Sequence, residues 1–97
     1  MSLFTEGQNR ITPDFLENQI VSVEYTEIVP KKLTHCTITV ANNFTFTGES
    51  ACVDPANYKQ EIGESIAYDN AFDKMWPAYG FLLAQHLYEN EIGRAHV

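Results

Sequence analysis

The stretch from residue 35 to residue 49 constrains the fold most, because its side chains alternate with the period of a β-strand on both sides of a polar loop. Two runs, His35–Val40 and Phe44–Glu49, place apolar residues and threonines in turn, and Ala41-Asn42-Asn43 separates them. A period of two is typical of a strand with one buried face. The chain is therefore expected to contain an antiparallel hairpin.

The length of the loop decides which face of this hairpin is buried. A two-residue turn at Asn42-Asn43 would place Ile38 and Val40 on the face opposite to the two phenylalanines. A three-residue loop pairs Val40 with Phe44 instead, and Asn43 tolerates the left-handed conformation that such a loop needs. Because a shift by one residue moves every side chain to the other face, only the second register leaves a core. One face then holds Cys36, Ile38, Val40, Phe44 and Phe46, and the other holds Thr37, Thr39, Thr45 and Thr47.

Further elements are predicted on both sides of the hairpin. Residues 11–20 read as a short helix, with Thr12 as its cap and Pro13 at its first position. Residues 21–28 alternate like a third strand, with Val21, Val23 and Tyr25 facing inward. Residues 48–53 are expected to leave the sheet, and Asp54-Pro55 to open a helix.

The C-terminal part is expected to be a long helix. From Tyr58 to Tyr79, helical spacing gathers large apolar residues on one broad face. Pro77 should kink or restart this helix, because proline lacks the backbone donor and crowds the preceding turn. Residues 81–88 continue as a second apolar piece. The face consists of Tyr58, Ile62, Ile66, Tyr68, Phe72, Met75, Trp76 and Tyr79.

The order of these elements predicts an α+β fold. A short N-terminal helix precedes a three-stranded antiparallel sheet, and a long C-terminal helix, kinked near Pro77, packs on one face of the sheet. We expect residues 1–10 to form a flexible arm, residues 11–92 a single domain and residues 93–97 a tail.

Charge and cysteine content narrow the function classes. The net charge is −7, with 6 basic and 13 acidic residues, which disfavours direct binding of nucleic acid because phosphates require clustered lysine and arginine. An acidic surface instead favours solubility, or binding to a basic protein partner.

The apolar stretches are too short to span a bilayer and no secretory signal is visible. Cys36, Cys52 and the scattered histidines do not form a zinc pattern, so no cofactor or metal is expected.

Two catalytic or binding patterns can be weighed and set aside. Ser50, with Glu49 and either His35 or His86, resembles a hydrolase set, but the second glycine of a nucleophile elbow is missing. The element order also matches that of double-stranded-RNA-binding domains, a likeness at the level of fold alone. Those domains place basic residues at a helix start, where this chain has acidic ones.

Asp69 and Asp73 are the most unusual positions of the long helix. They are four residues apart and fall within its apolar arc. Paired carboxylates there would act as acid and base or bind a hard cation. The structural alternatives are a bond to loop amides, a pair with a lysine, or a helix rotated so that both are exposed.

Three ordered motifs of the chain resemble a family of small phage and prophage proteins, and the resemblance covers roughly residues 35–84. That family is named after protein forty-nine of one coliphage and gene sixty-six of a Shigella phage. The resemblance implies a non-structural accessory protein in the cytoplasm of an infected or lysogenic cell, and it carries no catalytic residues over. The motifs are Gly48–Tyr58, Ile62–Ala71 and Lys74–Leu83.

Within these motifs, Tyr68, Asn70, Lys74 and Trp76 have hydrogen-bonding reach and are candidates for a recognition surface together with Asp69 and Asp73. Trp76 before a kink also fits the core. The first hypothesis is a non-catalytic protein that binds a host protein. The alternative is a small-ligand module that holds a nucleotide signal at a subunit interface, and the third is a small metal-dependent enzyme. A homo-oligomer is compatible with each of these hypotheses.

Overall fold

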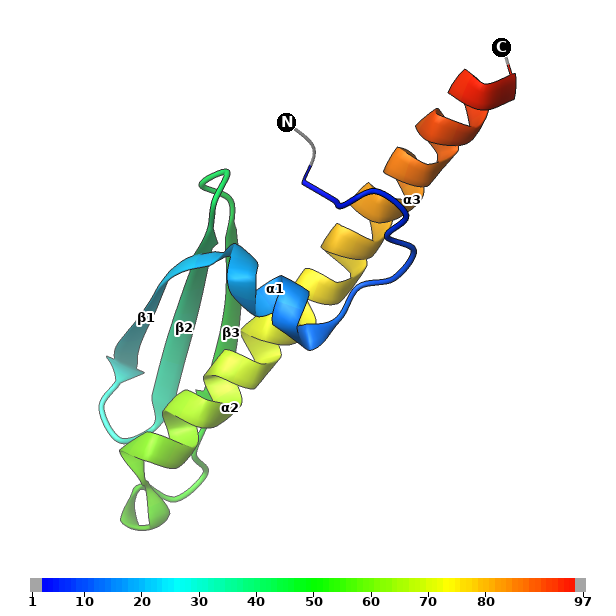
Figure 1. Ribbon diagram of the computed structural model, residues 1–97. Coiled ribbons are helices and arrows are strands. Elements are labelled where there is room, and N and C mark those ends of the chain that lie inside the picture. The colour runs from blue at the N-terminus through cyan, green and yellow to red at the C-terminus, as the bar shows by residue number, and fades with distance from the viewer. Residues whose placement is uncertain (1–2, 96–97) are drawn as a thin grey trace.

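A computed structural model describes residues 3–95, with side chains described as far as residue 91. It has the α+β architecture expected from the sequence: a short helix, an open three-stranded antiparallel sheet in the order β1-β2-β3, and a long C-terminal helix bent by 22° (Figure 1). The elements are α1 (Pro13–Gln19), β1 (Ile20–Val29), β2 (Leu33–Val40), β3 (Thr45–Ala51), a 3₁₀ turn (Pro55–Asn57), α2 (Gln60–Asp73) and α3 (Met75–Ala95).

The central hairpin has the predicted register. Ile38 pairs with Phe46, and the backbone N–H of Val40 donates to the carbonyl of Phe44 at 3.0 Å. Asn43 takes the left-handed conformation, with φ at 73°. Phe44 departs from the expectation, because it is 61% exposed at the hairpin tip, past the part of the sheet that α2 covers (Figure 1).

Strand β1 carries a bulge that changes which of its residues face inward. Ile20 pairs with Val40 but the next pair is Ser22 with Thr39, so Val21 has no partner across the strands. The expected inward position of Val21 is wrong, and this side chain is 68% exposed. A bulge adds one residue to one strand and thereby shifts the alternation. Val23 is half-buried on the core face as predicted, opposite Ile38.

Strand β3 continues past the point where the sequence predicts an exit from the sheet. Gly48 pairs with Cys36, and the strand runs to Ala51. A Cβ atom at Gly48 would lie 2.3 Å from the backbone nitrogen of Ala71 and 2.5 Å from the backbone oxygen of Ala67. This glycine therefore marks the close approach of α2 to the strand and not a turn.

In α2 the long helix faces the sheet with a stripe of small residues and not with the large side chains that were predicted there, whereas in α3 Met75 and Tyr79 are buried as predicted. Ile62 and Ile66 are 54% and 45% exposed. Small residues allow the backbone of α2 to lie directly on β2 and β3, so the helix is rotated away from its largest apolar side chains. The buried residues recur every four positions, at Gly63, Ala67, Ala71, Met75, Tyr79 and Leu83.

The predicted kink is present just before Pro77. The helix is interrupted at Lys74, whose N–H bonds to the carbonyl of Ala71 at 3.1 Å. Pro77 has no N–H to offer the carbonyl of Asp73, four residues earlier, and its ring crowds that carbonyl. Helix α3 then continues to Ala95, so the expected tail begins inside it, and residues 96–97 lie outside the described residues.

The N-terminal segment contains an anchor that the sequence did not reveal. Residues 3–12 contain neither helix nor strand, but Phe4 is only 7% exposed. Its ring lies 5.5 Å from that of Phe15 in α1 and 5.5 Å from that of His86 in α3. The arm expected over residues 1–10 is thus tied down at Phe4, and residues 1–2 lie outside the described part.

Candidate functional site

Three aromatic rings follow one another along the junction of α2 and α3. Tyr68 stacks on Phe72 with ring centroids 5.7 Å apart, and Phe72 meets Trp76 edge to face at 6.2 Å. All three are half-buried and pack partly against the core. We call Tyr68, Phe72 and Trp76 the aromatic ladder. The sequence pattern placed Phe72 on the apolar face of the long helix and not in the recognition surface. Its spacing of four residues from Tyr68 and from Trp76 is the signal that could have placed it between them.

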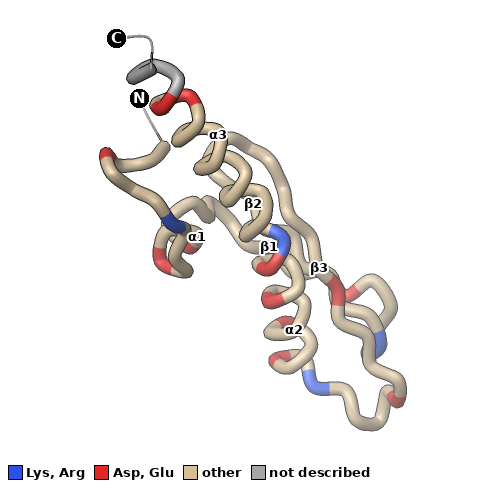
Figure 2. Tube along the Cα trace, turned by 90° about the vertical axis from the view of Figure 1, so that its right-hand side faces the viewer, with Lys and Arg blue, Asp and Glu red and all other residues tan. Residues whose placement is uncertain are grey.

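Two carboxylates act on the Tyr68 end of the aromatic ladder. The pKa of the Tyr68 phenol is raised, first by burial and then by the charges of Glu17 on α1, Cys36 and Asp69. Tyr68 therefore remains a neutral phenol at neutral pH, close to two carboxylates. More widely, acidic positions follow α1 and α2 (Figure 2).

Asp69 and Asp73 are both exposed. Of the alternatives weighed for them, the structure has the rotated helix: the small-residue stripe faces the sheet, and the two carboxylates lie on the solvent side of α2. They are therefore part of an acidic surface beside the aromatic ladder.

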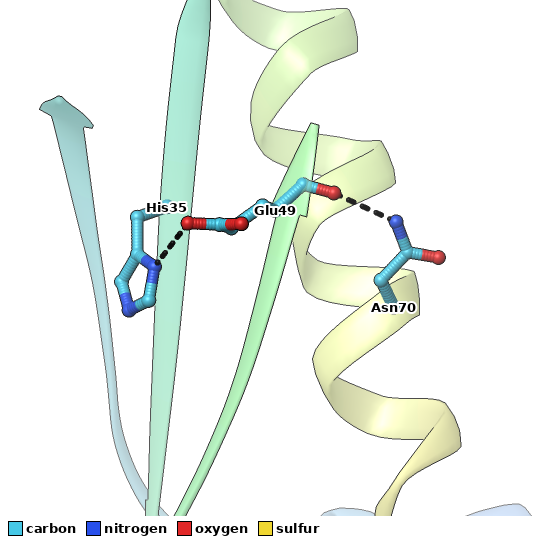
Figure 3. A network of polar contacts seen from close by, with 3 residues as sticks. All are labelled: His35, Glu49 and Asn70. Atoms are coloured by element: carbon cyan, nitrogen blue, oxygen red, sulfur yellow. Dashed lines mark hydrogen bonds and ion pairs between the residues drawn. The ribbon is translucent and has the colours of Figure 1, made fainter. Parts of the chain in front are cut away.

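Asn70 has a structural contact on the other side of α2. Its side-chain Nδ2 donates to the backbone carbonyl of Glu49 at 2.8 Å, which fastens the edge strand β3 to the helix (Figure 3). Tyr68, in contrast, lies near α1. The structure thus brings Tyr68 and Trp76 together through Phe72 but separates Asn70 from them.

Lys74 occupies the interruption between the two helices and is exposed. Its backbone N–H caps α2 by bonding to the carbonyls of Ala71 and Phe72. Among the described residues no hydrogen bond or ion pair of its side-chain amine is recorded, so Lys74 adds an accessible positive charge next to the exposed Asp73.

The residues considered for hydrolysis are not assembled. His35 Nδ1 lies 3.5 Å from Glu49 Oε2 on the outer face of the sheet (Figure 3). Ser50 pairs with Thr34, and successive strand residues point to opposite faces, so its hydroxyl is on the other side of the sheet from His35. His86 lies beside Phe4 on α3.

The two cysteines are free thiols in separate places. Cys36 is fully buried, and burial raises the pKa of its thiol, so it is protonated and unreactive at neutral pH. Cys52 is half-buried, and its Sγ lies 3.0 Å from the carbonyl oxygen of Asp54. Within the described residues no three histidine, cysteine, aspartate or glutamate side chains are grouped to hold a metal ion.

Hollows of the described surface also lie away from the aromatic ladder, and two of them concern the candidate residues or α3. The first, of about 120 Å³, opens at the start of α2 beside Tyr58 and Lys59. Thr34 lines it, and the Oγ1 of this threonine is buried without a hydrogen-bond partner among the described residues. The second is an apolar groove of about 290 Å³ between the hairpin tip and α3, lined mainly by Val40, Phe44, Phe46, Tyr79, Phe81 and Leu82.

The described helices include none that combines the length and the apolar character needed to cross a membrane. In the comparisons with known proteins, a family model described as the Phage protein (N4 Gp49/phage Sf6 gene 66) family matches residues 11–87. This match reaches further toward the N-terminus than the motifs that carry the resemblance. No curated protein and no solved structure matches the chain.

Proposed function

The chain belongs to this phage protein family, and from that premise we propose that it is an accessory protein that acts without catalysis, by binding a protein of the infected host cell. The observation that carries the proposal is the aromatic ladder with its acidic surroundings. Tyrosine and tryptophan are the side chains that most often dominate the energy of a protein interface. Partly exposed rings supply contact area on a rigid helix.

The charge around the aromatic ladder indicates the kind of partner. Glu17, Asp69 and Asp73 lie on α1 and α2 near the three rings, in a chain of net charge −7. Such a surface favours a partner with a basic face, because complementary charge accelerates association and excludes acidic competitors. Host proteins that process nucleic acid present basic faces of this kind, and so do defence proteins that attack foreign nucleic acid. The site of action would be the host cytoplasm.

The proposal is tested with the host protein that co-purifies stoichiometrically with the chain. We expect Trp76→Ala to weaken the isolated complex by about tenfold or more, as at an interface hot spot. Asp69→Asn combined with Asp73→Asn should mainly slow association and reduce its salt dependence. Asn70 is left intact because it holds β3 to α2.

The matched control is Val53→Ala, which removes a side chain that is 95% exposed in the loop after β3. Surface plasmon resonance measures both rate constants, and circular dichroism confirms that each variant is folded. A Trp76→Ala variant that folds normally and binds with unchanged affinity would refute the ladder as the contact surface.

A second candidate function, binding of a small nucleotide-like ligand, is favoured by the hollow at the start of α2. The buried Thr34 Oγ1 has no hydrogen-bond partner within the described part of the chain, Tyr58 offers a ring for stacking, and Lys59 also lines the hollow. Asn70, a candidate site residue with hydrogen-bonding reach, is already engaged with Glu49. If a panel of nucleotides leaves the thermal midpoint of unfolding unchanged, this candidate function is rejected.

The third hypothesis, a metal-dependent enzyme, gains no support, since Asp69 and Asp73 are exposed without a third ligand among the described residues.

A further inference from the structure

Helix α3 contains a run without charge that is long for a helix at the surface. From Met75 to Tyr88, fourteen consecutive residues include no aspartate, glutamate, lysine or arginine. A helix at the surface of a globular protein normally carries charged or polar residues on the face opposite its apolar stripe. In the structure, the run is covered on one side, where Met75, Tyr79 and Leu83 are at most 5% exposed.

The opposite side of this run carries a second apolar stripe. Phe81 is 69% exposed and Tyr88 is 57% exposed, and the exposed Ala84 lies between them. Their spacings of three and four residues are those of the seam along which two helices pack in a coiled coil. We call Phe81, Ala84 and Tyr88 the α3 seam. Leu82 extends the apolar surface toward the exposed Phe44 at the hairpin tip.

The surface of the single chain is larger than that of a compact domain of its mass. A folded monomer of 11.0 kDa is expected to expose about 5,600 Å², whereas this chain exposes 6871 Å². The radius of gyration is 17.5 Å, against about 12.5 Å for a compact domain of this length. The chain measures 65 Å along its longest axis, because α3 extends away from the sheet (Figure 1).

We propose that the α3 seam is the interface between two copies of this chain. The chain as a whole exposes about 1,200 Å² more than a compact monomer of its mass. Covering the projecting part of α3 with a second copy would remove surface on the scale of the roughly 800 Å² that each partner buries in a standard stable interface. Beyond the contact of His86 with Phe4, the projecting part of α3 has little tertiary support, and an isolated helix of its length is marginal in water. It therefore needs a partner that is present whenever the chain is made, and a second copy meets that condition.

Charge also favours a second copy. Two chains of net charge −7 repel each other, so an uncharged surface is where they can pair at least electrostatic cost. The α3 seam is such a surface, and it offers no charge complementarity to a basic host protein. The inference is independent of the proposed function, because none of the three residues of the α3 seam belongs to the aromatic ladder.

The experiment is light scattering coupled to size-exclusion chromatography on the full chain. We expect the wild type to have about twice the mass of 11.0 kDa, or a higher multiple. Phe81→Glu combined with Tyr88→Glu should reduce the mass toward that of one chain, because four buried carboxylates would face each other. Val53→Glu, which adds charge at an apolar residue outside α3 that is even more exposed, should leave the mass unchanged.

Hydrogen exchange on the wild type keeps the test decisive if the double variant does not fold. Protection of the amides of residues 84–91 that decreases on dilution would support the pairing, and Phe81→Ser should lower it at constant concentration. A wild type that has the mass of one chain and exchanges rapidly in this segment would overturn the proposal. A host protein would then be the remaining candidate for the partner that covers the α3 seam. A folded double variant with the wild-type mass would overturn the proposal as well.

Discussion

Gly48 lies where the backbone of α2 crosses β3, and the contact leaves no room for a side chain. The atoms that a Cβ would meet, at Ala71 and Ala67, belong to the helix backbone, so no rotamer change can make space. We expect Gly48→Ala to lower the free energy of unfolding by at least about 2 kcal/mol, the range of an overpacked core. Urea denaturation followed by circular dichroism measures the loss.

The matched control is Gly80→Ala. A Cβ at Gly80 meets nothing within 4 Å, and the residue lies inside a helix. Alanine there should raise the free energy of unfolding by about 0.5–1 kcal/mol, because glycine loses more backbone freedom on folding. Equal stabilities of the two variants would mean that α2 does not approach β3 this closely.

At the scale of elements, local patterns predicted the hairpin well and the long helix less well. Alternation and a loop-length argument were sufficient to place Ile38 opposite Phe46, because only one register leaves a core. The buried face of α2 depends instead on how near the helix lies to the sheet, a tertiary distance. The sequence therefore predicted large residues such as Ile62 in the core. In the structure the smaller Gly63 and Ala67 are buried there instead.

The same limit applies to the candidate site and to the N-terminal arm. Tyr68 and Trp76 could be found from composition and spacing, but the engagement of Asn70 by Glu49 joins residues 21 positions apart and leaves no local signal. The contact of Phe4 with Phe15 and His86 is equally non-local.

Phe4 connects α1 to the projecting part of α3. We expect Phe4→Ala to lower the free energy of unfolding by about 2–3 kcal/mol, slightly below the cost for a phenylalanine at the centre of a core. It should also accelerate hydrogen exchange around His86. Leu3→Ala, which truncates a neighbour that is 44% exposed, should change stability by no more than about 0.5 kcal/mol. If both substitutions have the same small effect, the arm is not anchored at Phe4.

At the scale of the whole molecule, the fold class follows from element order, whereas the elongated shape does not. Each element was expected to pack back on the sheet, as in a compact domain. The uncharged run from Met75 to Tyr88 is visible in the sequence. Because its residues were expected to pack in the core, no exposed apolar side was predicted. Only the structure shows that the other side, with Phe81, faces solvent.

The stability of the whole molecule should fall at alkaline pH. Burial raises the pKa of Cys36 above its ordinary 9.0, and burial likewise raises the pKa of Tyr79 and Tyr68 above 10.0. In the unfolded chain these groups ionise at their ordinary values, so above about pH 9 the native state binds more protons and the free energy of unfolding decreases with pH. Their contribution is complete below pH 9 and is lost as the pH rises through the folded pKa values.

The measurement is urea denaturation across a series from neutral pH to about pH 10.5. Cys36→Ala, which removes one of the ionising groups, should be less stable at neutral pH but should lose stability less steeply above about pH 9. The additional negative charge on a chain that already carries −7 acts in the same direction through self-repulsion. Added salt screens that repulsion but not the cost of ionising a buried thiol. If the alkaline loss of unfolding free energy disappears in high salt, it is caused by net charge. If Cys36→Ala loses stability as steeply as the wild type, ionisation of Cys36 does not contribute to the loss.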